Sequence, residues 1–142
     1  MSNSPAYDLD MAVRTILEMV SERNVHYIRV PAQPEDNDGE GYLVLYPLTE
    51  AGRSGSMSEP EGDIEYVYQV TSVGIDAHQT RWLQDRVREA FVDRSGSGYT
   101  HSITPASGGT VQDRWTMIRG GPVADGEQLF RADDTYIVKC GR

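Results

Sequence analysis

The sequence predicts an α/β protein of the α+β type, in which a small mixed, largely antiparallel β-sheet is packed by two α-helices in the order α-β-β-β-α-β-β. Two segments, about residues 9–23 and 77–93, carry apolar residues at helical spacing. Alternating or continuous apolar segments bounded by Gly, Pro, Asn and Asp lie between and after them. With 142 residues, the chain can bury one core but not two. We therefore expect residues 1–142 to form a single domain.

The first helix is expected over about residues 9–23. Asp8 precedes the apolar positions and can cap the helix, and Asn24 can end it. The apolar positions at helical spacing are Leu9, Ala12, Val13, Ile16, Leu17 and Val20. These positions predict one amphipathic helix that packs on the sheet.

Two short strands are expected next. "VHYIRV" reads as a strand that Pro31 ends, and "YLVLYP" reads as a second strand closed by Pro47. Between them lies the polar, acidic stretch "AQPEDNDGEG". Two strands joined by one long acidic turn indicate an antiparallel pair.

A long loop and a central strand follow. Residues 48–63 are rich in Gly, Ser, Pro and Glu and show no periodicity, so we expect a flexible loop of a length uncommon inside compact domains. From residue 64 to residue 71, alternate side chains point to opposite faces of the third strand, and both faces carry apolar residues. This strand is therefore expected in the middle of the sheet.

The stretch "YQVTSVG" runs from this strand directly into the second helix. Gly74 either opens a helix N-terminus to an anion or simply allows a tight turn. Asp76 favours the turn, because its carboxylate occupies the cap position and would repel a phosphate; with Gln79 it resembles a capping box. The apolar stripe of this helix, which is expected to face the core, is Trp82, Leu83, Val87, Ala90 and Phe91. Its outer face is expected to carry Arg81, Asp85, Arg88 and Glu89.

The rest of the chain is expected to supply two strands. A Gly/Ser-rich loop covers residues 94–109, and "TVQDRWTMIRG" then reads as one long strand. The turn-rich stretch "GPVADGEQLFRAD" connects it to the final strand, "DTYIVKCG".

No motif of catalysis, cofactor binding or metal binding emerges. His26, His78 and His101 are expected in a strand, at a helix start and in a loop, without an i,i+4 pair or a cysteine cluster. The glycine-rich stretches lack the spacing of a phosphate-binding loop, and there is no G-x-S-x-G. Cys140, the single cysteine, is expected to be a packed residue at a strand end. We therefore predict no enzyme, no cofactor and no metal.

The charge and hydropathy exclude further classes. With 22 acidic and 13 basic side chains, the net charge is -9, which argues against a surface that binds nucleic acid. No apolar run approaches the roughly 20 residues that cross a bilayer. The start "MSNSPAYDLD" lacks a basic segment followed by an apolar one, so we expect no membrane and a protein kept in a cytoplasm or in something assembled there.

Residues 68–91, "YQVTSVGIDAHQTRWLQDRVREAF", resemble a segment of the tail terminator proteins of long-tailed phages that infect actinobacteria. That segment reads Y-Q-V-T-S-V-G and, after a few residues, Q-A-x-W-L-x-D-x-V-R. Thr80 and Arg81 stand where the family often has small or acidic residues. The N-terminal helix, the "YIRVP" strand and the acidic loop match the family's layout, so the resemblance covers most of the chain.

The resemblance implies a structural subunit in a hexameric ring that caps the completed tail tube, ends tail polymerisation and joins the tail to the head connector. The implied partners are other copies of the chain, the tail tube protein and the head-tail connector protein. DNA would pass through without sequence-specific binding. The implied location is the virion, at the neck end of the tail, and the host cytoplasm during assembly. The alternatives are another neck component, such as a head-closure or adaptor protein, and, more distantly, a small hydrolase or ligand-binding protein.

Two sets of charged residues are candidates for contacts within such a ring. Arg81, Arg86 and Arg88, followed by Arg94, either face an acidic neighbour or form a solvated helix face. The acidic set faces either the lumen, where it would keep DNA from sticking, or the outer rim, where it would keep the subunit soluble. In the 48–63 loop it comprises Glu50, Glu59, Glu61 and Asp63 with the basic Arg53, and in the preceding turn Glu35, Asp36, Asp38 and Glu40.

Overall fold

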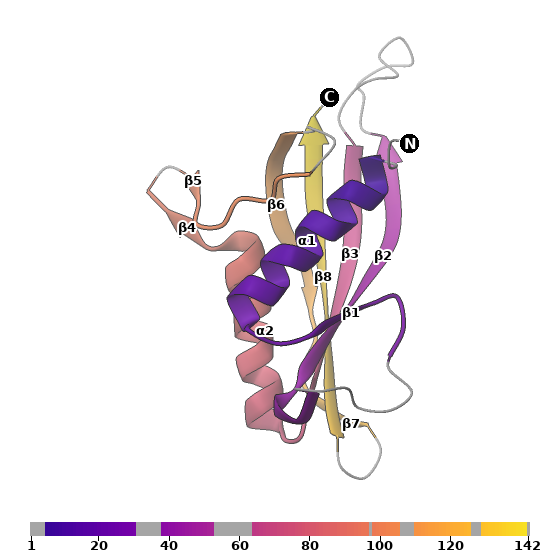
Figure 1. Ribbon diagram of the computed structural model, residues 1–142, viewed down its shortest axis with the longest axis vertical. Coiled ribbons are helices and arrows are strands. Elements are labelled where there is room, and N and C mark those ends of the chain that lie inside the picture. The colour runs from indigo at the N-terminus through magenta and orange to yellow at the C-terminus, as the bar shows by residue number, and fades with distance from the viewer. Residues whose placement is uncertain are drawn as a thin grey trace.

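The computed structural model describes residues 5–30, 38–52, 64–96, 98–105, 110–125 and 129–141. The predicted fold class is confirmed: two helices pack on a mostly antiparallel mixed sheet (Figure 1). In chain order the elements are α1 (Pro5–Ser21), β1 (Val25–Tyr27), the 3-10 turn η1 (Asp38–Glu40), β2 (Tyr42–Gly52), β3 (Ile64–Gly74), α2 (Ala77–Val92), β4 (Arg94–Ser95), β5 (Gly98–Tyr99), β6 (Thr110–Arg119), β7 (Val123–Asp125) and β8 (Leu129–Gly141).

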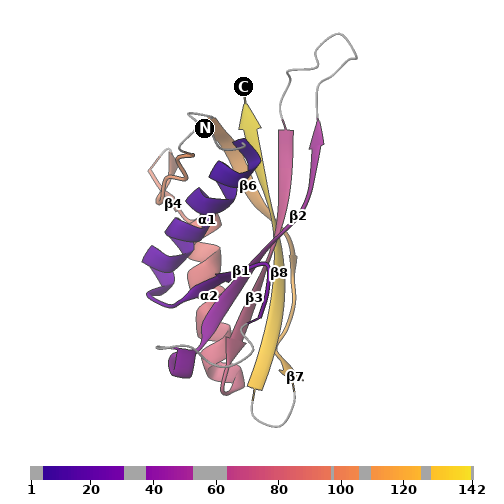
Figure 2. The same cartoon turned by 45° about the vertical axis from the view of Figure 1, so that its right-hand side comes forward.

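The main sheet has the strand order β1-β2-β3-β8-β6, and β7 pairs with β8. Both helices lie on one face of the sheet, as Figure 2 shows. The predicted central position of the third strand is confirmed, because β3 pairs with β2 on one side and with β8 on the other. The sheet therefore has one face under the helices, an open face, and two outer edges formed by β1–β2 and by β6–β7.

The predicted antiparallel pairing of the first two strands is wrong. β1 runs parallel to β2, with Val25 opposite Leu43 and Tyr27 opposite Leu45. A parallel pair needs a connection of roughly a dozen residues to carry the chain back to the same end of the sheet. The connection over residues 28–41 is long enough to do so.

The second strand does not end at Pro47. β2 continues to Gly52, so residues 48–52 of the predicted loop are strand, and residues 53–63 lie outside the described residues. A register shift between Pro47 and Thr49 marks a bulge. Proline is tolerated there because β1 pairs only as far as Leu45, which leaves this part of β2 at an edge and beside a bulge.

The first helix is offset from its predicted bounds. It begins at Pro5, a residue that suits the first turn because its missing N–H needs no partner there. Asp8 consequently lies inside the helix and is buried rather than capping it. The helix ends at Ser21, before Glu22 adopts a left-handed conformation with φ 56°.

The second helix is confirmed together with its cap. The Asp76 carboxylate accepts a hydrogen bond from the Gln79 amide at 2.7 Å, and Gln79 Oε1 accepts from the Ile75 amide at 2.8 Å. A Cβ at Gly74 would lie 2.7 Å from Thr80 Oγ1 and 2.9 Å from Thr80 N. Gly74 therefore permits close packing of the strand end on the helix, as the architectural interpretation predicted.

The core between the helices and the sheet contains aromatic and polar groups as well as aliphatic ones. Phe91 of α2 stacks on Tyr136 of β8, with ring centroids 4.3 Å apart. Asp10 of α1 is buried and accepts hydrogen bonds from the hydroxyls of Tyr27, at 2.5 Å, and Tyr68, at 2.6 Å. One carboxylate thus ties the first helix to two strands of the sheet.

A short hairpin that the sequence did not predict follows α2. β4 and β5 pair within the stretch expected to be a loop, and the hairpin projects from the body of the protein (Figure 1). Two guanidinium groups lie over the Tyr99 ring, that of Arg94 at 4.4 Å and that of Arg114 at 4.2 Å from the ring centroid. Arg114 is buried and donates to the carbonyls of Ala90 and Phe91 at the end of α2. These contacts join the hairpin, the helix end and β6.

Candidate functional site

The three histidines, which are the described side chains best suited to acid–base or metal chemistry, lie in three separate elements of the fold. His26 is in β1, His78 is in the first turn of α2, and His101 follows β5. Over the described ranges, no group of three or more His, Cys, Asp or Glu residues could hold a metal ion. No helix in the described part is long and apolar enough to cross a bilayer.

Cys140 lies near the end of β8 and is half-buried. Burial raises the pKa of its thiol to about 11, so the reactive thiolate is a minor form at neutral pH. This agrees with the prediction of a packed residue.

The three candidate arginines of α2 do not form one surface. Arg81 and Arg88 are two turns apart and lie on the flank of the helix that faces β6. There Arg81 donates to Gln84 Oε1 at 3.3 Å, while Gln84 donates to the Gly120 carbonyl at 2.6 Å. Arg86 lies on the opposite flank, where it pairs with Glu89 at 3.2 Å.

Trp82 is not a core residue, contrary to the prediction. Its side chain is 37% exposed, and the guanidinium groups of Arg23 and Arg86 lie 5.0 and 5.6 Å from its ring centroid. Gln84, which is fully buried, faces the core in its place. The apolar pattern predicted the helix correctly but not which of its sides faces the core. Gln84 is buried because it donates hydrogen bonds to Asp134 of β8 and to the Gly120 carbonyl, and spacing along the sequence cannot reveal such partners.

We therefore expect Trp82→Ala to fold and to lose about 1 kcal/mol of unfolding free energy, in place of the about 3–5 kcal/mol of a fully buried tryptophan. The reason is that Trp82 is already 37% exposed and that its ring lies under the guanidinium groups of Arg23 and Arg86 at the surface. Urea unfolding of the variant beside Leu83→Ala, a fully buried neighbour on the same helix, measures the difference. A loss for Trp82→Ala as large as that for Leu83→Ala would contradict the exposed position.

Most of the candidate acidic residues lie outside the residues that the structure describes. Glu50 is in β2, and its side chain is not described. Glu40 belongs to η1 and approaches Arg23 at 3.8 Å. The candidates outside the described residues are Glu35, Asp36, Arg53, Glu59, Glu61 and Asp63.

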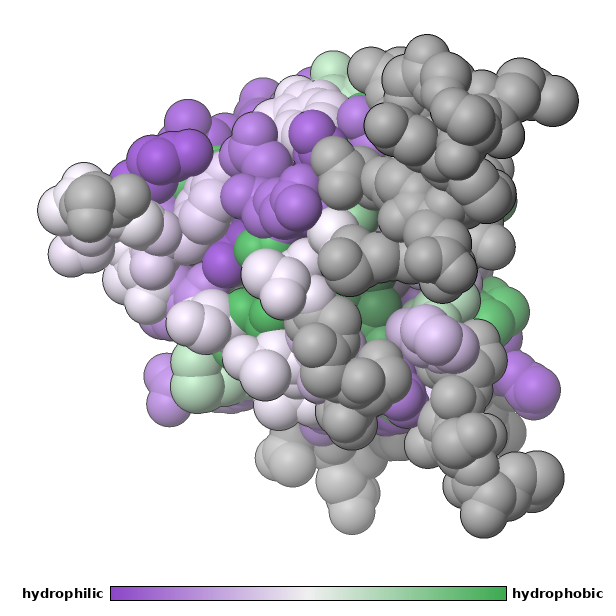
Figure 3. Space-filling view, turned by 90° about the horizontal axis from the view of Figure 1, so that it is seen from above, coloured by the Kyte–Doolittle hydropathy of each residue, from purple (hydrophilic) through white to green (hydrophobic). Residues whose placement is uncertain are grey.

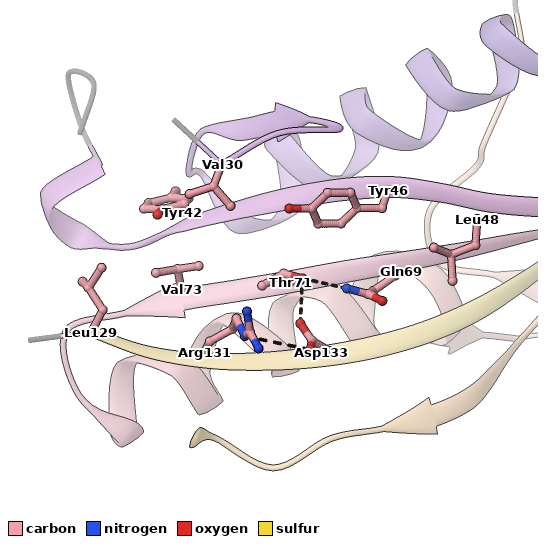
Figure 4. A pocket seen from close by; sticks show the side chains of 10 residues that line it. All are labelled: Val30, Tyr42, Tyr46, Leu48, Gln69, Thr71, Val73, Leu129, Arg131 and Asp133. Carbon is pink, nitrogen blue, oxygen red and sulfur yellow. Dashed lines mark hydrogen bonds and ion pairs between the residues drawn. The ribbon is translucent and has the colours of Figure 1, made fainter. Parts of the chain in front are cut away.

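The open face of the sheet carries a shallow groove of about 260 Å³ that the sequence analysis missed (Figure 4). Along its floor Gln69 donates to Thr71 at 3.1 Å, and Thr71 donates to Asp133 at 2.7 Å. Arg131 approaches Asp133 at 4.0 Å. The apolar and aromatic side chains that line the groove are Val30, Tyr42, Tyr46, Leu48, Val73 and Leu129. The alternation of Tyr42, Val44 and Tyr46 in β2 was the available signal that this face is also apolar.

An apolar row crosses the same open face beside the groove. Cross-strand register places Val67 of β3 opposite Ile137 of β8, and Ile137 opposite Trp115 of β6. All three side chains are half-buried. By comparison, the end of the molecule where β8 finishes presents mainly hydrophilic side chains, with apolar ones in small areas between them (Figure 3). Apolar surface of the described residues thus lies on the open face, and also on the helices, where Met19 and Trp82 are exposed.

Exposed apolar side chains also mark both edges of the sheet. Ile28 and Leu48, at the β1–β2 edge, are more than half exposed, as are Met117, Ile118 and Val123 at the β6–β7 edge. Contiguous exposed apolar groups are typical of interaction surfaces. The molecule thus offers surfaces suited to binding another protein.

The fold recurs in solved structures. No protein-family model matches the chain, and no curated protein matches it. A chain in the solved virion of a native gene transfer agent particle is 19% identical, with a TM-score of 0.65, and the match covers 98% of this chain and 98% of that one. A second solved chain, which has no descriptive name, is 13% identical, with a TM-score of 0.52 over 94% of this chain and 92% of that one. At these identities the likeness establishes the shared fold.

Proposed function

We propose that this protein is a structural subunit of a phage-like particle. One observation carries the proposal: the fold matches, from end to end, a chain of a gene transfer agent virion, with 98% of each chain covered. The likeness covers 98% of both chains, so it is a likeness of the whole fold and not of a single motif. The proposed role is structural rather than catalytic.

Within such a particle, we propose the role of tail terminator. Residues 68–91 support this role through their resemblance to the tail terminator proteins of phages that infect actinobacteria. The subunit would form a ring, six-membered in that family, on the end of the completed tail tube, stop further addition of tube subunits, and present its other side to the head connector. Closed rings arise from a heterologous contact whose rotation closes.

Binding to purified tail tubes tests this role. Tubes from particles that lack the subunit are incubated with the protein, pelleted and imaged by negative stain. We expect the protein to pellet with the tubes and to appear as a single ring at one end, because a tube end can supply association energy that free subunits lack. Binding along the whole tube, or binding to the connector without the tube, would favour another neck component and contradict the terminator role.

The acidic stretch supplies a second test. Changing Glu50, Glu59, Glu61 and Asp63 to serine or asparagine should leave folding within about 0.5 kcal/mol, as is usual for surface changes. If these residues face the lumen, particles should assemble yet eject DNA slowly, because weaker repulsion lets phosphates linger at the rim. The defect should ease at high salt, which screens those contacts. Normal ejection at low salt would place the stretch on the outer rim.

A further inference from the structure

The open face of the sheet does not have the composition of a solvated face. In an antiparallel sheet with one face on the core, the other face usually carries polar side chains at alternate positions. Here Tyr42, Val44 and Tyr46 alternate on the open face of β2. With Val73 of β3 they form an apolar cluster of their own, separate from the core under the helices. The apolar row that ends at Trp115 extends this surface, which is therefore suited to contact another protein.

The groove on this face suits a docking surface better than a site for a small ligand. On its walls, Val30 and Leu48 are each 51% exposed. On its floor, the polar side chains are already joined to one another, from Gln69 through Thr71 to Asp133. Over the described ranges, no buried side-chain polar atom of a groove residue lacks a hydrogen-bond partner. The floor thus offers no buried polar group for a small ligand to satisfy, whereas the walls offer apolar surface.

The two charged residues that line the groove, Arg131 and Asp133, have opposite signs. They lie two residues apart on β8, so their side chains share one face, about 7 Å apart along the strand (Figure 4). Arg131 Nε is 4.0 Å from a carboxylate oxygen of Asp133, and the two side chains are 52% and 43% exposed. The ion pair is therefore a loose one, and each member has surface left for a second partner.

The edges of the sheet are less suited than its open face to pairing with a second copy. β6 bulges at Val111/Asp113 and at Thr116/Ile118. β2 bulges beside Pro47, in the part of the strand that β1 does not reach. Bulges and proline are devices by which edge strands avoid pairing with another chain. A contact between copies through side chains of the open face is therefore favoured over added backbone pairing.

From these observations we propose that two free copies of the chain pair through their open faces, about a two-fold axis that passes between Arg131 and Asp133. The axis places Arg131 of each copy opposite Asp133 of the other, so two ion pairs form across the contact. A two-fold contact requires a self-complementary patch of this kind. The net charge of -9 makes two copies repel each other, but the charges that line the groove sum to zero. Face-to-face packing of two sheets through apolar side chains is the arrangement of β-sandwiches.

This contact goes beyond the proposed function. A two-fold contact joins two copies and cannot by itself close a ring of six, which needs a head-to-tail contact. Pairing therefore belongs to the free subunit, in which it covers apolar surface before the subunit joins a particle. Its tests use the free protein and do not depend on binding to tail tubes.

Charge reversal in the groove tests the pairing. Arg131→Asp gives each copy two carboxylates and Asp133→Arg gives each copy two guanidinium groups, so each variant alone should associate about tenfold more weakly than wild type. An equimolar mixture should regain association, because every carboxylate then meets a guanidinium. Sedimentation over a range of concentrations measures association, and thermal melting shows that each variant folds. Arg88→Asp is the control and should associate as wild type does, because it makes the same change of charge on α2, at the other face of the sheet.

Leu48→Thr tests the apolar part of the contact without a change of charge. Because Leu48 is more than half exposed, the melting temperature should stay close to that of wild type. Association should weaken about tenfold, as for an apolar residue at the centre of a contact. Met19→Gln is the matched control, since Met19 is 58% exposed but lies on α1, behind the sheet. Leu48→Thr that associates as well as the control would overturn the proposal.

The two proposals fail differently. A wild-type chain that stays monomeric up to about 1 mM, or a mixture of the two charge variants that associates no better than its components, overturns the two-fold contact even if the protein binds tail tubes. If wild type is monomeric and Arg131→Asp no longer binds tubes, the open face belongs to the tube protein instead. Failure of wild type to bind tubes contradicts the terminator role alone, and rescue in the mixture would still establish the contact.

Discussion

Asp10→Ala is expected to lower the free energy of unfolding by about 2–4 kcal/mol, since a buried hydroxyl left without its acceptor costs about 1–3 kcal/mol and a half-buried one costs less. Two hydroxyls lose their acceptor, those of Tyr27 and Tyr68. Burial, the largest cause that raises the pKa of both phenols, persists in the variant, so both hydroxyls stay protonated and unpaired. Urea unfolding followed by circular dichroism measures the change.

Two further variants separate the hydrogen bonds from the packing around them. Asp10→Asn keeps one acceptor oxygen and should lose about 1–2 kcal/mol less than Asp10→Ala. Adding Tyr27→Phe and Tyr68→Phe to Asp10→Ala removes the stranded hydroxyls and should recover part of the stability. If the triple variant is less stable than Asp10→Ala by the sum of the separate losses, the carboxylate does not couple these groups.

Phe91→Ala is expected to destabilise the protein by about 3–5 kcal/mol, the range for removing a large buried aromatic side chain. The Phe91 ring is buried and stacks on Tyr136, with an angle of 4° between the ring planes. The substitution removes one half of this pair and leaves a cavity between α2 and β8. Chemical unfolding at fixed pH measures the loss.

The neighbouring residue provides the control. Val92 is half-buried and is the last residue of the same helix, so Val92→Ala should cost about 1 kcal/mol or less. Equal losses for the two variants would mean that the Phe91–Tyr136 contact is not central to the core. A loss below about 1.5 kcal/mol for Phe91→Ala would contradict its position directly.

The second helix and the central strand could be predicted because their signals are local. Asp76, three residues before Gln79, makes a cap from neighbouring atoms, and the structure contains that cap. Residues 64–71 alternate and carry apolar residues on both faces, which predicted a strand in the middle of the sheet. β3 is such a strand, because it lies between β2 and β8. These features depend on residues within a few positions of each other.

Other features depended on contacts between residues far apart in the chain. Gln84 is buried because Asp134, fifty positions away, accepts its hydrogen bond at 2.8 Å, and this partner moved Trp82 outwards. The direction of β1 depended on where the chain returned after residue 30, and no local pattern specifies that. Strand continuation past Pro47 likewise depended on β1 being too short to reach it.

The candidate surfaces divide in the same way. By itself the sequence determined the fold class, the two helices, the surplus of acidic residues in one stretch and the resemblance of residues 68–91 to tail terminators. Only the tertiary structure decided that Arg86 parts from Arg81 and Arg88, that a groove lies on the open face, and that exposed apolar side chains mark both edges of the sheet. The physical reason is that spacing along a chain fixes which side of one element a residue occupies, whereas a surface is built from several elements whose order is set by the packing of the whole core.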